Sequence, residues 1–317
     1  MQILRDFIMP GLFLHYWRNF IMNSVFSPYA HLARLHMLTG WHLVLLPSLW
    51  STIFAAYPLR RAGLLSWSTI FWYLCFYLIG SIIVRSAGCT WNDLVDHNID
   101  SQVSRTRSRP LPAGQCSRSR AYIFAIFQFA ISFILLLQLN YFVICIGFAV
   151  FVVLLIYPFS KRFIPCPQVV LGICFGGGVF IGWGSLHESF SWTAFWLFMG
   201  TIFWVIHFDT VYAHQDKKDD ERIGINSTAR LFADHTKIWI SILYSLFTLC
   251  FMIALYLVQA NFFAWIGLLI ALFFTIKRII SLEISSSDQC FLFFKTADMT
   301  GMFIFASLIF SLFLDQF

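Results

Sequence analysis

Charged side chains are scarce in this sequence of 317 residues. Only 11% of the residues are Asp, Glu, Lys or Arg, whereas a soluble globular domain carries about 25%. A surface so poor in charge would not stay dispersed in water, and a hydrophobic content of 59% excludes an intrinsically disordered chain. The composition therefore predicts a polytopic membrane protein.

Metal-binding cysteine pairs are also missing. The chain has eight cysteines, none of them in a Cys-x-x-Cys arrangement, and most lie in apolar runs. Free cysteine in such runs behaves as a small hydrophobic side chain. We therefore expect neither a disulfide scaffold nor a cysteine-ligated metal site.

The N-terminal region lacks the features of a cleavable signal peptide. Arg5, Asp6 and Arg18 interrupt its apolar residues too often for the hydrophobic part of such a signal. We interpret residues 1–30 as an amphipathic segment that lies on the membrane surface. Residues 31–317 are then expected to form one transmembrane domain.

Long apolar runs fill most of the chain. Because a membrane-spanning helix needs roughly 20 mostly apolar residues, nine segments qualify. They lie near residues 39–58, 64–88, 121–139, 141–159, 168–187, 191–211, 238–259, 262–281 and 298–315. The predicted fold class is an all-α membrane protein with nine transmembrane helices.

The basic residues fall on one side of these spans. All of the 21 Lys and Arg residues except Arg60, Arg61 and Arg85 lie before the first span or in loops that share one side. The positive-inside rule makes that side cytoplasmic, with the N-terminus inside and the C-terminus outside. We expect the membrane to be a bacterial inner membrane. We interpret Arg60 and Arg61 as contacts to lipid headgroups on the far side.

The cytoplasmic loop after the second span begins with an unusual acidic run. If that helix continues, Asn92, Asp96 and Asp100 lie at i, i+4 and i+8 and share one face, with Asp93 beside them. Carboxylates placed in this way repel each other. We therefore expect a cationic group among them.

The same arrangement returns after the sixth span. Asp216 and Asp220 are again at i and i+4, with Asp209 about two turns earlier on the same expected helix. We call these two sets of residues the first and second acidic ladders. Carboxylate oxygens suit hard divalent cations, and Mg²⁺ is commonly held by a few carboxylates together with substrate phosphates. The paired ladders therefore predict a Mg²⁺–diphosphate site.

Basic residues near the ladders fit such an anion. Arg105 and Arg109 follow the first ladder, and Lys161 and Arg162 follow the fourth span. A transporter is the alternative class, but transporters place their charged sites near the membrane midplane on interrupted helices. Here the acidic groups lie at the interface.

These segments carry a resemblance to a known family. The chain resembles the UbiA superfamily of intramembrane prenyltransferases, and within it the members that act on 4-hydroxybenzoate, over about residues 30 to 315. The most specific matches are Arg-Pro-Leu-Pro-Ala-Gly at 109–114 and Tyr-Ala-His-Gln-Asp at 212–216. Further matches lie at 85–93, 157–162, 167–172, 223–229 and 290–291. The resemblance implies nine helices around a central cavity, with the acidic loops forming a cytoplasmic cap.

Residue roles follow from the same resemblance. It implies that Mg²⁺ is bound by Asn92, Asp96, Asp100, Asp216 and Asp220. It further assigns Tyr157 and Lys161 to the diphosphate, and Arg34 and Arg85 to the aromatic acid.

The implied reaction is Mg²⁺-dependent transfer of a polyprenyl group from its diphosphate to the ring carbon ortho to the hydroxyl of 4-hydroxybenzoate, in ubiquinone biosynthesis. We expect Asp96, Asp216, Lys161 and Arg162 to act in catalysis, with Arg109 on the diphosphate. The partners are then the two substrates and the lipid bilayer, without nucleic acid.

Two points stay open. Arg85 lies within a span, where it either binds the carboxylate of the acceptor or pairs with Asp93 or Asp96. The first span begins atypically, with His36 and Met37 where the family usually has Asp and Lys, followed by Trp41 and His42. A prenyltransferase of the same type that acts on another aromatic or quinone-precursor acceptor is therefore the alternative.

Overall fold

The computed structural model describes residues 26–315, and in that range the protein is helical without strands. Within residues 26–315, nine helices are long and apolar enough to cross a membrane, as predicted. They are α4 (Leu38–Arg61), α5 (Trp67–Val95), α7 (Arg118–Leu136), α8 (Tyr141–Ser160), α9 (Gln168–His187), α10 (Trp192–Ala213), α13 (Thr236–Leu257), α14 (Phe262–Ser281) and α16 (Ala297–Leu314).

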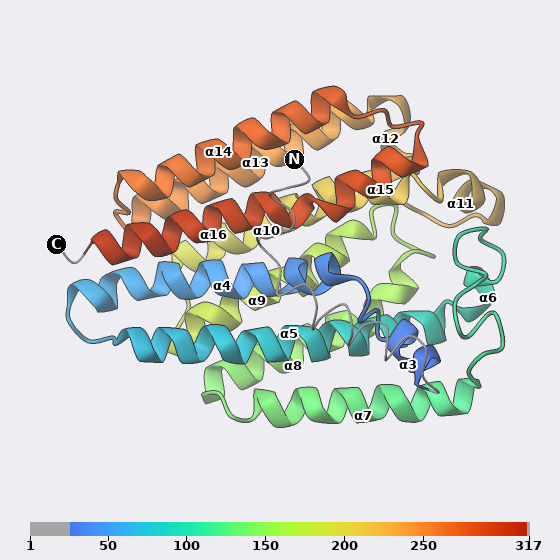
Figure 1. Ribbon diagram of the computed structural model, residues 1–317, viewed down its shortest axis with the longest axis horizontal. Helices are drawn as coiled ribbons and strands as arrows, with labels where there is room; N and C mark the ends of the chain where they lie inside the picture. The colour runs from blue at the N-terminus through green and yellow to red at the C-terminus, as the bar shows by residue number, and fades with distance from the viewer. Residues whose placement is uncertain (1–25, 316–317) are drawn as a thin grey trace, which may run out of the picture.

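Short helices lie at one end of the bundle, where α3 precedes the first long helix and the others connect long helices (Figure 1). They are α3 (Ser27–Leu32), α6 (His97–Asp100), α11 (Lys217–Ile223), α12 (Thr228–Phe232), the 3₁₀ helix η1 (Ala233–His235) and α15 (Ser287–Lys295). We call residues 96–117 and 214–235 the cap. Most of the predicted amphipathic segment, residues 1–25, lies outside the described residues.

The connections at the opposite end are short because polar side chains start the next helix directly. Ser66 accepts a hydrogen bond from the backbone N–H of Thr69 at 3.1 Å, and Asn140 accepts one from Val143 N–H at 3.0 Å. These caps satisfy backbone donors at the start of α5 and α8 that the helix itself leaves unpaired. A membrane makes this important, because unpaired backbone groups are costly in lipid.

Helix α4 occupies the centre of the bundle and packs against α5, α9 and α16. Trp50 of α4 is fully buried against Trp204 of α10 and Phe251 of α13. The backbones of α4 and α9 approach closely at Gly182, where an added Cβ would lie 2.5 Å from the carbonyl oxygen of Ser48. A larger residue at this position would separate the two helices that form one wall of the site.

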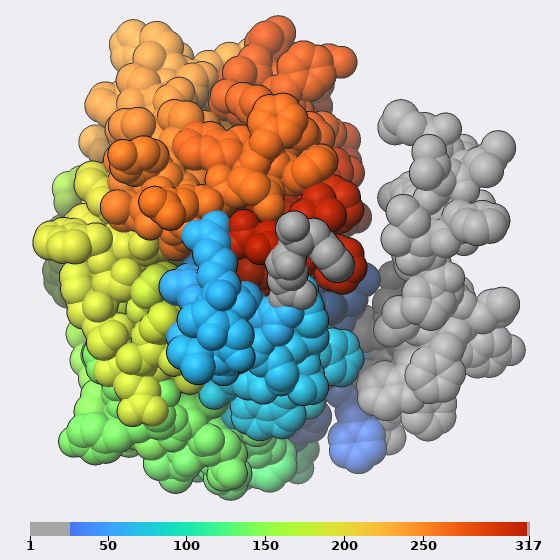
Figure 2. All heavy atoms as spheres, turned by 90° about the vertical axis from the view of Figure 1, so that its left-hand side faces the viewer, coloured from blue at the N-terminus to red at the C-terminus, as the bar shows by residue number. Residues whose placement is uncertain are grey.

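The end of the bundle opposite the cap, which faces the viewer in Figure 2, is held together by Arg61. Its guanidinium binds Asp315 at 2.5 and 3.1 Å and donates to the carbonyl oxygens of Val258 and Gln259 at 2.8 and 2.7 Å. Arg60 donates to the carbonyl oxygen of Leu65. Our interpretation of these arginines as headgroup contacts was wrong for Arg61, because its side chain joins the ends of three helices within the protein.

Candidate active site

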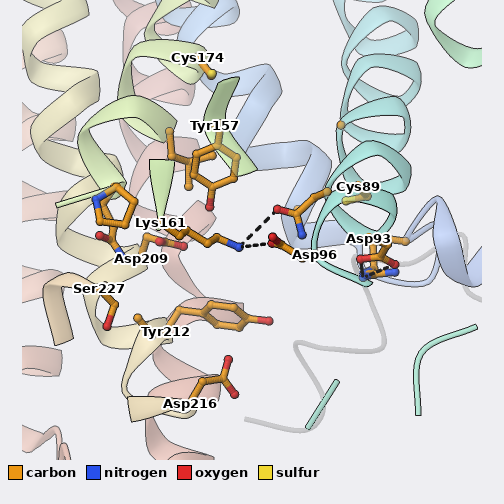
Figure 3. Close-up of a pocket in the computed structure, with 18 of the residues that line it drawn as sticks. Cys89, Asp93, Asp96, Tyr157, Lys161, Cys174, Asp209, Tyr212, Asp216 and Ser227 are labelled. Carbon is orange, nitrogen blue, oxygen red and sulfur yellow. Dashed lines mark hydrogen bonds and ion pairs between the residues drawn. The ribbon is translucent and has the colours of Figure 1, made fainter. Parts of the chain in front are cut away.

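A cavity of about 300 Å³ lies under the cap, between α4, α5, α8, α9 and α10. Both acidic ladders line its cap end, and apolar side chains such as Val84, Leu154 and Phe175 line the part that lies deeper between the helices. Figure 3 shows Lys161 and Asp96 pointing toward each other across this space. The cavity therefore joins a charged region to an apolar one.

The first ladder keeps its i, i+4 spacing although the helix is interrupted. Helix α5 continues to Val95, seven residues beyond the predicted end at 88, and the backbone turns at Asp96 before α6 begins. The N–H of Asp96 still donates to Asn92 O at 2.9 Å, and the N–H of Asp100 donates to Asp96 O at 2.8 Å. Asn92, Asp96 and Asp100 consequently line the same cavity.

Cations lie among these acids, as expected. Lys161 Nζ lies 2.8 Å from Asp96 Oδ2 and 3.4 Å from Asn92 Oδ1. Arg109 Nη1 binds Asp100 at 2.8 Å and Asp93 at 3.1 Å. Burial disfavours the charged form of Lys161, but Asp96 and Tyr157 raise its pKa well above the usual value. Burial raises the pKa of Asp100, and Arg109 opposes that shift.

The second ladder also follows a break in the helix. Asp209 lies on α10, whereas Asp216 precedes α11 and Asp220 lies within it. Our prediction of one continuous helix was wrong, because the chain turns at residues 214–216, where the charged segment leaves the apolar bundle. The Asp220 N–H donates to Asp216 O at 2.8 Å, so these two acids retain their spacing.

One cation holds the second ladder as Lys161 holds the first. Arg105 Nε donates to Asp216 Oδ1 at 2.8 Å, and Arg105 Nη1 donates to the Tyr212 hydroxyl at 2.7 Å. Tyr212 precedes Asp216 by four residues, as Asn92 precedes Asp96. Both ladders therefore present a polar residue, an acid at the helix break and a cation from another loop. The sequence indicated Arg105 as a basic residue that follows the first ladder, but its contact with the second ladder was not predicted.

Arg34 forms a salt bridge with Asp93, the acid beside the first ladder. Its Nη2 contacts both carboxylate oxygens of Asp93, at 2.7 and 2.9 Å, and its Nη1 donates to His31 O at 2.7 Å. Asp93 is fully buried. The backbone of Arg34 has φ = 53°, which is uncommon for a residue with a side chain. Asp93 thus fixes Arg34 at the side of the cavity.

Arg85 is placed differently from Arg34, although it also lines the cavity. It makes no salt bridge with any acid of residues 26–315, so the structure does not show the pairing with Asp93 or Asp96. Its Nη1 donates to Cys89 Sγ, and its buried Nε has no hydrogen-bond partner. A buried cation with a free donor beside a cavity is suited to an anionic ligand.

The structure places ten of the eleven predicted site residues on the cavity surface; the exception is Arg162. The Arg162 guanidinium turns outward, where it donates to Val95 O at 3.3 Å and stays 4.0 Å from Asp96 Oδ1. Tyr157 lies beside Lys161, whose Nζ is 5.6 Å from the ring centre. Arg162 therefore lies at the rim of the cavity. The sequence could not show this, because the direction of a side chain in a loop does not follow from its position in the chain.

The residues of the atypical first span mostly face away from the cavity. Met37 and Gly40 line it, but His42 Nδ1 lies 2.6 Å from Asp298 Oδ2 of α16, and Trp41 packs toward Tyr77 of α5. The polar His42 and the bulky Trp41, which are unusual for the family at this place in the sequence, therefore form contacts between helices. Asp209 of the second ladder also lines the cavity, although no role in binding Mg²⁺ or substrate was predicted for it. Its carboxylate within an apolar span was the signal for such a role.

The ladders offer oxygen atoms suited to a hard divalent cation. Asp96 Oδ1 is buried without a hydrogen-bond partner, and Asp220 makes no salt bridge in the described range. Burial and the neighbouring Asp216 raise the pKa of Asp220 to about 7. No three His, Cys, Asp or Glu side chains within residues 26–315 converge as a complete ligand set. These acids do not form a complete cation site by themselves, and a hard divalent cation bound here would take its remaining ligands from phosphate oxygens and water.

Comparisons with known proteins agree with this arrangement. The family model for the UbiA prenyltransferase family matches residues 44–308. A 4-hydroxybenzoate octaprenyltransferase of Tolumonas auensis is 36% identical over 91% of this chain and 98% of its own length. A mitochondrial 4-hydroxybenzoate polyprenyltransferase of Aedes aegypti is 39% identical over 71% of this chain, and the chain spans about half (49%) of that protein.

Two solved structures share the fold. The apo structure of a UbiA homologue from Aeropyrum pernix superposes with a TM-score of 0.71 at 21% identity, covering 85% of this chain and 97% of that one. A UbiA homologue from Archaeoglobus fulgidus bound to GPP and Mg²⁺ gives a TM-score of 0.58 at 15% identity, covering 90% and 99%. With these matches and its nine apolar helices, the protein is an integral membrane protein. The chain belongs to the UbiA prenyltransferase family.

Proposed function

We propose that this protein transfers a polyprenyl group from polyprenyl diphosphate to the ring carbon ortho to the hydroxyl of 4-hydroxybenzoate, in a Mg²⁺-dependent reaction of ubiquinone biosynthesis. The observation that carries the proposal is one cavity with two different anion-binding regions: the ladders with their cations, and the separate, unpaired Arg85. Relatives that share 36–39% of their residues carry the corresponding names.

The diphosphate belongs at the cap end. Asn92, Asp96 and Asp100 on one side and Asp216 and Asp220 on the other would hold Mg²⁺, which neutralises charge that develops on the departing diphosphate. The homologue from Archaeoglobus fulgidus was solved with GPP and Mg²⁺, which supports this choice of ligand.

Cations already at the ladders assist the leaving group. Lys161 and Arg109 each contact a ladder carboxylate at 2.8 Å. Once positive charge neutralises those carboxylates, the same Nζ and Nη1 donors become available to phosphate oxygens. Donors fixed beforehand at a site of developing negative charge lower the barrier most effectively.

The acceptor belongs deeper, at Arg85. Its guanidinium can bind the acid's carboxylate, which places the phenol end of the ring toward the ladders. In the reaction the allylic C–O bond breaks, the ring carbon ortho to the hydroxyl forms the new C–C bond, and that carbon then loses its proton. Val84, Leu154 and Phe175 line this region and exclude the water that would otherwise capture an allylic cation.

We also propose the membrane orientation. The cap would face the cytoplasm, because the cap and the connections beside it contain most of the Lys and Arg residues. A bacterial inner membrane remains our expectation for the location. Access of a thiol reagent to a single cysteine introduced at Lys218, compared with one introduced at Glu188, tests this orientation in intact cells and in inverted vesicles.

The direct test uses purified protein in detergent with Mg²⁺, geranyl diphosphate and a panel of phenolic acids. We expect prenylation of 4-hydroxybenzoate that stops with EDTA and resumes when Mg²⁺ is restored. Release of diphosphate only with another acceptor would replace 4-hydroxybenzoate in the proposal. Absence of product and of diphosphate release with the whole panel would refute it.

A further inference from the structure

Gly40, in the first turn of α4, lies directly against the guanidinium of Arg85 on α5. A Cβ atom built on Gly40 would lie 3.1 Å from Arg85 Nε, 3.2 Å from Nη2 and 3.5 Å from Cζ. The first two separations are shorter than normal contacts between such atoms. A side chain at position 40 would therefore require the Arg85 guanidinium to move by a few tenths of an ångström.

Few directional interactions hold Arg85 in place. Its Nη1 donates to Cys89 Sγ, its Nε has no partner, and no acid of the described residues forms a salt bridge with it. Arg34 contrasts with it, because Asp93 binds that guanidinium through both oxygens. The position of Arg85 thus depends mainly on packing, which includes its contacts with the backbone at Gly40 and with Cys89.

A methyl group at position 40 would displace the guanidinium. Because the Arg85 guanidinium already contacts Cys89 and lines the cavity, we expect it to shift along the cavity surface. The change should not disturb the helix itself, because Ala favours helix more than Gly does. Any effect of the substitution should therefore arise at Arg85.

We propose that Gly40 is a positioning residue that sets the Arg85 guanidinium for the carboxylate of the aromatic acceptor. This inference rests on the proposed function, since it assumes that Arg85 binds that carboxylate. Gly40 thereby determines how deep the acid lies, and with it which ring carbon faces the prenyl group. The ligand class is an aryl carboxylate whose acid group lies opposite the reacting end of the ring.

The test compares Gly40→Ala in two backgrounds. In the native chain we expect the KM for 4-hydroxybenzoate and its equilibrium dissociation constant, measured without prenyl diphosphate, to rise about tenfold, as for loss of one charge-assisted hydrogen bond. The KM for geranyl diphosphate should stay within about twofold of wild type. In an Arg85→Lys background the same substitution should change binding less than about twofold, because lysine has neither Nε nor Nη2 to meet the methyl group.

Gly80→Ala on α5 is the matched control, since a Cβ there would meet nothing within 4 Å, and it should leave both KM values unchanged. If Gly40→Ala fails to fold, Gly40→Ala combined with Arg85→Lys should fold, and failure of both overturns the proposal. If the wild type prenylates 4-hydroxybenzoate but Gly40→Ala has equal effects in the two backgrounds, the role of Gly40 is also overturned. A wild type that binds no 4-hydroxybenzoate and forms no product instead refutes the proposed function itself.

Discussion

Replacing Asp93 by Asn should destabilise the protein strongly, because this acid compensates two guanidiniums. Asp93 is fully buried and makes three short contacts, two with Arg34 at 2.7 and 2.9 Å and one with Arg109 at 3.1 Å. Removing one member of a buried charged pair costs about 3–5 kcal/mol, because the remaining charge is left unpaired. The surroundings of Asp93 in the structure narrow this range of free energies.

Two features reduce the cost and one restores part of it. The side chains of Arg34 and Arg109 retain 13% and 20% of their exposure, so water screens part of their charge, and Arg109 keeps Asp100 at 2.8 Å. Arg34, however, has a strained backbone at φ = 53°, and the bidentate contact helps to maintain that conformation. We expect a net loss of about 3 kcal/mol.

Thermal unfolding in detergent, followed by the fluorescence of the 12 tryptophans, measures this loss. It should appear as a fall in Tm of about 5–10 °C. Asp234→Asn, at an exposed position of η1, is the control and should change stability by less than about 0.5 kcal/mol. The loss should shrink when Arg34→Gln is combined with Asp93→Asn, because one uncompensated charge is then absent. A Tm for Asp93→Asn within about 1 °C of wild type would show that Asp93 does not carry this charge balance.

Three further outcomes follow from the site and the far end of the bundle. Asp96→Asn and Asp216→Asn should each lower kcat at least about 100-fold while the protein elutes from a sizing column as wild type does; normal turnover would remove that acid from the metal site. The Asp220 pKa of about 7 means that its carboxyl is protonated below neutrality, so Mg²⁺ affinity should fall about tenfold from pH 8 to pH 6 in fluorescence titrations. An affinity independent of pH would contradict this assignment. Arg61→Leu should cost about 1 kcal/mol of stability and leave both KM values unchanged, whereas a changed KM would argue against a purely structural contact with Asp315.

The hydrophobic runs predicted the nine helices of residues 26–315, and the i, i+4 spacing of the acids predicted that Asn92, Asp96, Asp100, Asp216 and Asp220 would form one site. These signals are local, so a window of about 20 residues contains them. The breaks at Asp96 and Asp216 could not be predicted in this way. Lys161 and Arg105, which hold those two acids, are 65 and 111 residues away from them in the chain.

The same limit explains the error at Arg61 and the direction of Arg162. Asp315 follows Arg61 by 254 residues, and nothing near Arg61 in the sequence indicates that partner. Arg162 follows Lys161 directly, yet only Lys161 faces the cavity, because the turn after α8 points adjacent side chains in different directions. Side-chain direction in a loop depends on the tertiary structure, and the sequence pattern alone does not contain it.

The central place of α4 has a consequence for biogenesis. Of the nine candidate spans in residues 26–315, α4 is the most buried, and one of the helices that covers it is α16, the last of these spans. During synthesis, α4 thus meets α16 only after the seven spans that lie between them in the chain have been made. Until then, Trp50 lacks Gly301, whose carbonyl oxygen accepts its indole N–H at 3.0 Å. A chain truncated before residue 297 would expose this surface to lipid and to quality-control proteases.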